Sequence, residues 1–152
     1  MLNPDYRDIL FAFADAGVEY LLVGAYALAA HGQPRATGDI DLWVRPTSAN
    51  AERVMQALNA FGAPLARVNA KDFEASEVVF QIGVSPRRID ILTSIASVDF
   101  ESAWADRLEI KLEGIVVPVL SREHLVQNKK AVGRPQDLAD VDRLSGMNSE
   151  QP

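Results

Sequence analysis

The sequence contains no cysteine, which excludes disulfide bonds, thiolate catalysis and zinc sites built from cysteine. It has only two histidines, His31 and His124, and they lie too far apart in the sequence to form a metal-ligand motif. The longest apolar stretch, residues 20–30, is well below the length of about 18 residues that a membrane-spanning helix needs. No signal-peptide pattern opens the chain, so we expect a cytoplasmic protein that does not enter the membrane.

The composition is that of a globular protein. Of the 152 residues, 48% are hydrophobic and 24% are charged, which leaves no reason to consider a disordered or fibrous class. The length fits one domain, so we expect residues 1–146 to form a single domain and residues 147–152 a frayed tail. The net charge of −6 disfavours broad binding to nucleic acid and favours small substrates or protein partners.

Two aspartates, Asp39 and Asp41, interrupt an apolar run. Because Ile40, Leu42 and Val44 form the buried face of a predicted strand, the alternation of side chains places both carboxylates on the opposite face. Two such anions about 5 Å apart repel by roughly 3 kcal/mol at an effective dielectric constant of about 20. A divalent cation would remove this repulsion, and Mg²⁺ prefers carboxylates combined with substrate phosphates. The pair therefore predicts a metal-dependent site for a phosphate-bearing substrate.

Apolar periodicity, capping residues and turn residues predict the other elements. The predicted helices are residues 4–16, 24–31, 48–61, 100–105, 122–131 and a last helix from residue 135, with Leu138, Val141 and Leu144 pointing inward. The predicted strands are residues 20–23, 39–44, 78–82, 88–92, 107–112 and 115–120. The third and fourth strands, and likewise the last two, are predicted to form hairpins. Residues 65–76 show no clear period and are predicted to be a loop with a helical turn.

Two further positions fit a phosphate-transfer site. Gly24 lies where a predicted buried strand turns into a helix, and a residue without a side chain lets phosphate approach the N–H groups at the helix start. Asp90 alternates with Ile89 and Ile91 on a predicted strand, so it lies on the polar face. A third carboxylate would complete a two-metal arrangement and could accept a proton from an attacking hydroxyl.

Two segments resemble a known family. The run from Val23 to Trp43, which holds the glycine turn and the Asp-x-Asp pair, resembles the signature of the nucleotidyltransferase superfamily that includes DNA polymerase β. The segment from Lys129 to Asp140 resembles a second motif of small bacterial members related to the abortive-infection and type IV toxin–antitoxin nucleotidyltransferases. The two segments lie toward opposite ends of the chain, and their combination is specific.

The resemblance implies an α/β (α+β) fold like that of polymerase β, with a short mixed sheet flanked by helices and a C-terminal helical hairpin. It implies a metal-dependent enzyme that transfers a nucleoside monophosphate from a nucleoside triphosphate (NTP) to a hydroxyl acceptor. In this implied site Mg²⁺ or Mn²⁺ is bound by Asp39, Asp41 and Asp90. The acceptor is a protein, a tRNA or a small molecule such as an aminoglycoside, and the residues do not choose among these.

The residues predicted to bind the nucleotide phosphates are Gly24, Ala25, Arg35, Thr37 and Lys129. The alternative role of Lys129 is to complement the dipole of its helix. Two positions depart from the family pattern: Ala25 lacks the hydroxyl of the serine often found there, and Gln136 stands where lysine is common. These departures leave open a second interpretation, a weakly active or inactive binding module in a toxin–antitoxin pair. Asp137 is expected to pair with Arg134 or a nearby lysine and so to hold the helical hairpin together.

Overall fold

A computed structural model gives the structure of residues 2–33 and 38–149. Its helices are α1 (Pro4–Ala16), α2 (Gly24–Ala30), α3 (Ser48–Phe61), α4 (Phe100–Ala105), α5 (Arg122–Val132) and α6 (Pro135–Ser149), with a short 3₁₀ helix, η1, at Ala70–Phe73. Its strands are β1 (Tyr20–Val23), β2 (Ile40–Val44), β3 (Val79–Ile82), β4 (Ile89–Leu92), β5 (Leu108–Leu112) and β6 (Ile115–Val119). Within these described ranges, no helix is both long and apolar enough to cross a membrane.

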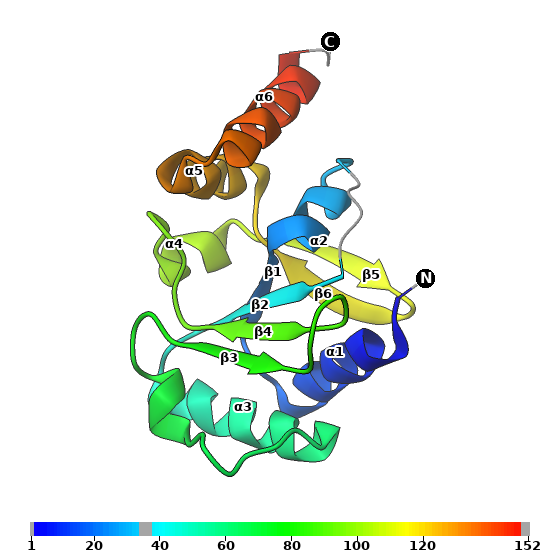
Figure 1. The fold of residues 1–152 in the computed structure, drawn as a ribbon, viewed down its shortest axis with the longest axis vertical. Helices are drawn as coiled ribbons and strands as arrows, with labels where there is room; N and C mark the ends of the chain where they lie inside the picture. Colours follow the sequence, from blue (N-terminus) through cyan, green and yellow to red (C-terminus); the bar gives the residue numbers. More distant parts are fainter. Residues whose placement is uncertain (1, 34–37, 150–152) are drawn as a thin grey trace.

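The strands form one mixed sheet in the order β3-β4-β2-β1-β6-β5 (Figure 1). The two outer pairs, β3 with β4 and β5 with β6, are antiparallel hairpins, as the sequence predicts. In the centre β1 is antiparallel to β2, and β2 is parallel to β4. Helices α1 and α3 pack together and α1 also contacts β6, whereas α6 contacts α5 and extends away from the sheet (Figure 1). The mixed sheet with flanking helices confirms the predicted fold class.

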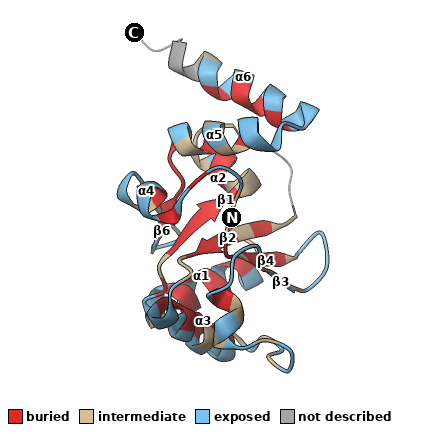
Figure 2. Cartoon of the chain, turned by 90° about the vertical axis from the view of Figure 1, so that its left-hand side faces the viewer, coloured by how far each residue is buried: buried red, intermediate tan, exposed pale blue. Residues whose placement is uncertain are grey.

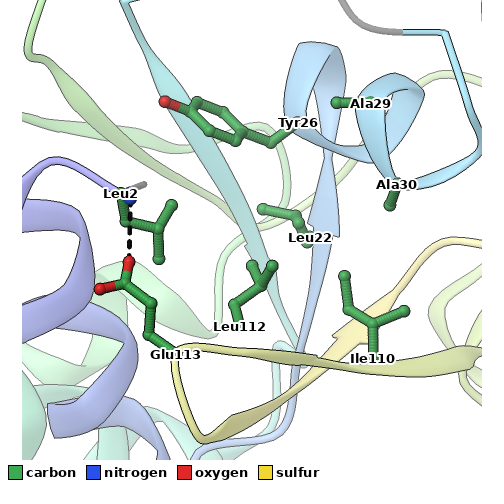
Figure 3. A pocket seen from close by; sticks show the side chains of 8 residues that line it. All are labelled: Leu2, Leu22, Tyr26, Ala29, Ala30, Ile110, Leu112 and Glu113. Carbon is green, nitrogen blue, oxygen red and sulfur yellow. Dashed lines mark hydrogen bonds between the residues drawn. The ribbon is translucent and has the colours of Figure 1, made fainter.

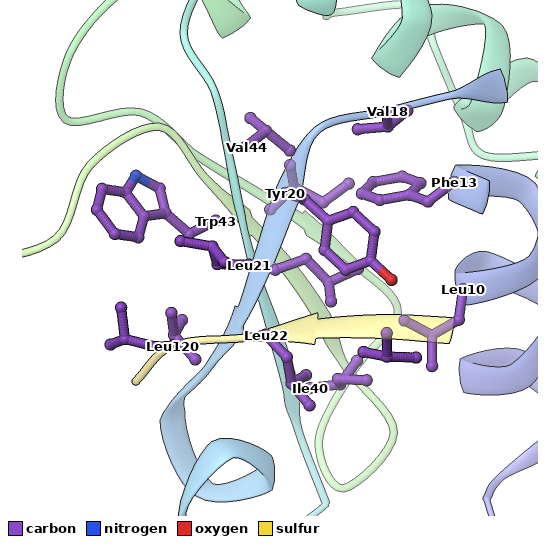
Figure 4. Close-up of a cluster of buried hydrophobic side chains, with 14 of the residues drawn as sticks. Leu10, Phe13, Val18, Tyr20, Leu21, Leu22, Ile40, Trp43, Val44 and Leu120 are labelled. Carbon is purple, nitrogen blue, oxygen red and sulfur yellow. The ribbon is translucent and has the colours of Figure 1, made fainter. Parts of the chain in front are cut away.

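The central strands are buried on both faces (Figure 2). On one face the ring of Tyr20 in β1 meets that of Phe13 in α1, with 5.1 Å between centroids. On the other face Trp43 of β2 meets Phe100 of α4 at 5.0 Å. Figure 4 shows Tyr20 and Trp43 on opposite sides of β1. Because β2 is packed on both sides, the position of its polar residues is tightly fixed.

The helix boundaries follow from caps that the sequence contains. Asn3 accepts a hydrogen bond from the backbone N–H of Asp5, Thr47 caps α3 and Ser121 caps α5. Gly17 ends α1 in the left-handed conformation. These caps explain why the predicted boundaries of α1 and α3 agree with the structure.

Helix α6 differs from its prediction at Leu138. Leu138 is 48% exposed, so the prediction that it points inward is wrong. The buried positions of α6 are Asp137, Asp140, Val141 and Leu144, which form one stripe at helical spacing, and Leu138 lies beside that stripe. The helix extends to Ser149. The predicted tail at residues 147–152 lies partly outside the described residues and stays a prediction.

Candidate active site

The three predicted carboxylates lie on one face of the sheet. In the parallel pair of β2 and β4, Asp41 stands directly beside Asp90, and their side chains are hydrogen-bonded to one another. Asp39 precedes Asp41 by two residues and therefore lies on the same face. The register between β2 and β4 thus brings together acidic residues that are about 50 positions apart in the sequence.

Gly24 forms the wall behind Asp41. Val23, the last residue of β1, pairs with Asp41 across the antiparallel ladder. Gly24 then turns the chain into α2 with φ +70°, a conformation that residues with side chains rarely adopt. A Cβ atom at this position would lie 2.2 Å from Oδ2 of Asp41. Only glycine provides both the turn and the space for the carboxylate.

Burial and neighbouring charges make Asp41 hard to ionise. Its pKa rises from 3.8 to about 7, chiefly because the carboxyl is buried and also because of the charge of Asp90 and the hydrogen bond to it. Asp39 adds a smaller effect of the same sign, and Arg88 opposes it. Burial and the neighbouring carboxylates thus disfavour the charged form of Asp41, and a bound cation would favour that form.

Arg88 and Ser85 contact the carboxylates, and our sequence predictions did not include either residue. Nη2 of Arg88 lies 3.1 Å from Oδ2 of Asp39, and its Nε lies 2.8 Å from Oδ1 of Asp90. The Ser85 hydroxyl donates to Asp39, with Oγ 3.0 and 3.2 Å from the two carboxylate oxygens. Alternation along β4 could have indicated Arg88, because it precedes Asp90 by two residues.

Tyr6 of α1 joins the start of β2 to the loop before β4. Its hydroxyl lies within hydrogen-bonding distance of the carbonyl oxygens of Gly38 and Arg88, the latter at 3.1 Å. Gly38 packs so closely on Pro86 that a Cβ atom would lie 2.1 Å from the Pro86 carbonyl oxygen. Burial, Tyr26 and the three aspartates raise the pKa of Tyr6 to about 12, so the hydroxyl stays protonated and donates. Tyr6 thereby fixes the backbone on both sides of the carboxylate cluster.

Replacing Tyr6 with phenylalanine is expected to lower the free energy of unfolding by about 1–2 kcal/mol, because the partly buried carbonyl group of Gly38 loses the Tyr6 donor. Tyr20→Phe provides the control. Among the described residues, the Tyr20 hydroxyl is one of the buried groups that have no hydrogen-bond partner, so its removal should leave stability unchanged or raise it. Urea unfolding of both variants measures the difference. A Tyr6→Phe variant as stable as Tyr20→Phe would contradict the role of the Tyr6 hydroxyl.

The predicted phosphate-binding residues fall into three groups. Gly24 and Ala25 begin α2, whose first turn is not capped by the side chain of Val23. Arg35 and Thr37 lie outside the described residues. Lys129 lies in α5, and its phosphate contact stays a prediction. Of the five predicted residues, Gly24 is therefore the one whose contact with the carboxylate cluster is described.

Lys129 is buried between α5 and α6 in a group of opposite charges. Its Nζ lies 2.9 Å from Asp140 and 3.5 Å from Asp137. Arg134 also pairs with Asp137 at 2.7 Å, and Arg143 with Asp140 at 3.4 Å. The bond to Arg134 lowers the pKa of Asp137, so Asp137 stays ionised. The expected pairing of Asp137 with Arg134 is confirmed, and the network joins the two C-terminal helices.

Replacing Lys129 with methionine should lower the free energy of unfolding by about 2 kcal/mol, because two buried carboxylates lose their shared cation. The loss stays below the 3–5 kcal/mol typical of a broken buried pair, since Arg134 and Arg143 still neutralise part of the charge. The control is Lys130→Met, because Lys130 is an exposed neighbour. Thermal melting compares the two variants. Equal melting temperatures would contradict the structural role of Lys129.

A separate pocket lies between α2 and the β5–β6 hairpin (Figure 3). Its volume is about 330 Å³, and its walls are mainly apolar, including Leu22, Ile110 and Leu112. Its polar side chains are those of Tyr26 and Glu113, and the Glu113 carboxylate already accepts a hydrogen bond from the backbone N–H of Leu2. An apolar pocket with a carboxylate does not suit a triphosphate, so the pocket is distinct from the candidate site.

The donor set of the carboxylate cluster fits a hard divalent cation. All three candidate ligands offer carboxylate oxygens, which Mg²⁺ and Mn²⁺ prefer. The absence of a side chain at Gly24 gives the Asp41 carboxylate its room, and the Arg88 guanidinium already supplies one positive charge to Asp39 and Asp90. Among residues 2–33 and 38–149, however, no three acidic, histidine or cysteine side chains are already arranged as a metal-binding group.

The fold of this chain is similar to those of solved nucleotidyltransferase structures. No protein-family model and no curated protein matches the sequence. Among solved structures, a candidate nucleotidyltransferase from Thermotoga maritima is 17% identical, with 99% of this chain and 97% of that chain covered and a TM-score of 0.59. The lincosamide antibiotic adenylyltransferase LnuA, in its lincomycin-bound structure, is 16% identical, with 95% and 97% covered and a TM-score of 0.60.

A third match points the same way. ANT(2″)-Ia in complex with adenylyl-2″-tobramycin is 17% identical, with 94% of this chain and 86% of that chain covered and a TM-score of 0.59. Each of these matches spans nearly the whole of this chain, so the likeness concerns the fold as a whole. The chain therefore has the nucleotidyltransferase fold, as the resemblance in the sequence implies.

Proposed function

We propose that this protein is a metal-dependent nucleotidyltransferase, which transfers a nucleoside monophosphate from an NTP to a hydroxyl acceptor. The observation that carries the proposal is the placement of Asp39, Asp41 and Asp90 on one face, against the glycine turn at Gly24. A protein released from catalysis would gain stability by losing clustered carboxylates, so their presence in this fold favours an enzyme. The proposed location is the cytoplasm.

In this proposal Asp39, Asp41 and Asp90 would hold Mg²⁺ or Mn²⁺, which would supply positive charge to neutralise the phosphates as negative charge develops on them. The backbone N–H groups of Gly24 and Ala25 bind phosphate oxygens at the start of α2. Ala25 contributes its N–H group although it lacks a hydroxyl. Arg35, Thr37 and Lys129 remain proposed further contacts to the nucleotide.

The proposed reaction is an in-line displacement at the α-phosphorus. The acceptor oxygen forms a bond to this phosphorus, the bond to the bridging oxygen of the β-phosphate breaks, and pyrophosphate leaves. The proton of the acceptor hydroxyl passes to Asp90, which is also a proposed ligand and lies beside Asp41. The protein contributes mainly by positioning the reactants and by neutralising charge.

The acceptor class is open among a protein, a tRNA and a small molecule. Two structural neighbours are linked to antibiotics in their names or complexes, lincomycin with LnuA and adenylyl-2″-tobramycin with ANT(2″)-Ia. Hydroxylated antibiotics are therefore the first acceptors to test. The net charge of −6 makes tRNA less favourable, because phosphate backbones are bound through cationic surfaces.

Labelled NTPs incubated with the protein and a cell extract test the proposal. We expect label to appear on an acceptor only with Mg²⁺ or Mn²⁺, and to disappear when Asp39 is replaced by alanine. Asp142→Ala is the control, because Asp142 is an exposed carboxylate on α6, and it should keep the transfer. Metal-independent labelling, or labelling that survives Asp39→Ala, would contradict the proposal.

The second candidate function is a binding module that partners a toxin or an antitoxin. The departures at Ala25 and at Gln136, which is exposed in the first turn of α6, favour it. Calorimetric titration separates the two functions. An enzyme binds NTP in a metal-dependent manner, whereas a binding module gives no heat with any Mg²⁺–NTP pair.

A further inference from the structure

Arg88 links two of the three carboxylates through a single side chain. Its Nη2 lies 3.1 Å from Oδ2 of Asp39. Its Nε and Nη2 lie 2.8 and 3.1 Å from the two oxygens of Asp90. This forked contact to Asp90 is the strong, planar geometry that arginine makes with carboxylates. One guanidinium therefore neutralises charge at the oxygens of Asp39 and Asp90 that are proposed to bind metal.

A divalent cation and the guanidinium compete for these oxygens. A cation bound to Asp39 and Asp90 would lie close to the positive charge of Arg88, and the repulsion is strong in a partly buried site. An arginine side chain keeps its proton in proteins, so Arg88 cannot relieve the repulsion by becoming neutral. It has to move.

The structure allows this movement. The Arg88 side chain is 31% exposed, so it has access to solvent on one side. Its backbone is held separately, because the Tyr6 hydroxyl lies 3.1 Å from the Arg88 carbonyl oxygen. The side chain can therefore leave the carboxylates while β4 stays in place. A guanidinium also binds phosphate oxygens in the same forked geometry.

Building on the proposed function, we propose that Arg88 is an internal counterion that the metal displaces and that then binds the nucleotide phosphates. In the metal-free protein it holds Asp39 and Asp90 in place. Bound metal weakens the interaction of the Arg88 guanidinium with the carboxylates, and the phosphate oxygens of a triphosphate then bind the guanidinium instead. Metal and nucleotide then bind cooperatively, because each favours the position of Arg88 that the other requires.

Titration with Mn²⁺, followed by electron paramagnetic resonance of the unbound ion, tests the proposal without turnover. In the absence of nucleotide, Arg88→Gln should bind Mn²⁺ about tenfold more tightly than the wild type, since the competing cation is gone. Arg87→Gln is the matched control, because it removes the same charge from an exposed neighbour in the same loop. Its Mn²⁺ affinity should stay within about twofold of the wild type, since exposed charges are screened.

A non-hydrolysable NTP provides the second readout. It should increase the Mn²⁺ affinity of the wild type by a larger factor than that of Arg88→Gln, in which the coupling is lost. Arg88→Lys keeps the charge without the forked contact, so its Mn²⁺ affinity should lie between those of the wild type and Arg88→Gln. If Arg88→Gln fails to fold, as a melting curve in EDTA would reveal, Arg88→Lys must still bind Mn²⁺ more tightly than the wild type.

Two results would overturn the role of Arg88. One is an Arg88→Gln variant that binds Mn²⁺ no more tightly than the wild type. The other is an equal gain in Arg87→Gln, which would show a general effect of charge. These outcomes differ from failure of the proposed function, in which the wild type binds no Mn²⁺ even with the NTP analogue present.

Discussion

Replacing Asp41 with asparagine is expected to lower nucleotidyl transfer by about 10³-fold while making the metal-free protein more stable at pH 8. The loss of activity follows from the proposed loss of a metal ligand, because stabilisation of charge by the metal contributes several kcal/mol to the transition state. Asparagine has nearly the same shape as aspartate, so it fits the space that Gly24 leaves beside residue 41. The same change therefore removes a charge without disturbing the packing.

The gain in stability follows from the raised pKa. In the folded protein the pKa of Asp41 is about 7, against 3.8 in the absence of these interactions. Because its pKa is raised in the fold, the Asp41 carboxyl makes its full contribution to the free energy of unfolding below pH 3.8. This contribution is lost as the pH rises through about 7. Ionising the carboxyl in the fold thus costs up to about 4 kcal/mol at pH 8. Recovering half of this cost would raise the melting temperature of Asp41→Asn by roughly 5 °C.

Melting curves in EDTA at pH 5 and pH 8 measure this effect. The advantage of Asp41→Asn over the wild type should be small at pH 5 and larger at pH 8. Asp142→Asn, at an exposed position, serves as the control. Its melting temperature should equal that of the wild type at pH 5 and at pH 8, because surface substitutions usually have little effect on stability. Adding Mg²⁺ at pH 8 should stabilise the wild type more than Asp41→Asn. A destabilised Asp41→Asn at pH 8 would contradict the account of the cluster.

Gly24→Ala is expected to lower transfer by about 10²-fold or more and to destabilise the fold. The added Cβ would lie 2.2 Å from Oδ2 of Asp41, so the carboxylate has to move. A displacement of about 1 Å in a catalytic group is enough for a loss of about 10²-fold. The positive φ of +70° adds a conformational cost of about 1–2 kcal/mol for any residue with a side chain.

Gly17→Ala separates these two effects. Gly17 has nearly the same backbone conformation, with φ +71°, and nothing lies within 4 Å of an added Cβ. The variant should therefore show the conformational cost and keep full transfer activity. Steady-state kinetics and melting curves of both variants provide the comparison. Equal activities would show that the close approach of Gly24 to Asp41 has no part in the reaction.

The local pattern of the sequence predicts the elements of this fold well, because caps and alternation act over a few residues. Alternation alone places Asp41 and Asp90 on polar faces of their strands. Their positions side by side depend on the parallel pairing of β2 with β4. That pairing joins segments distant in the sequence, and no local pattern contains it.

The residues that our predictions missed depend on tertiary packing. Tyr6 reads in the sequence as an apolar residue of α1, and its hydroxyl becomes important only because the loop before β4 folds over the start of β2. The helical turn predicted within residues 65–76, by contrast, is present as η1, which the Asn69–Asp72 capping box and the burial of Phe73 hold in place. The prediction that Leu138 points inward is wrong because the aspartates Asp137 and Asp140 occupy buried positions of α6.

The central claim is that Asp39, Asp41 and Asp90 together hold a divalent cation for an NTP. Anomalous scattering from crystals grown with Mn²⁺ and a non-hydrolysable NTP tests it most directly. The account predicts a Mn²⁺ peak bonded to oxygens of all three aspartates, with the triphosphate beside Gly24 and the Arg88 side chain turned from the carboxylates to the phosphates. A bound nucleotide whose metal lies away from these aspartates, or occupied crystals in which Asp90 contacts no metal, would contradict it.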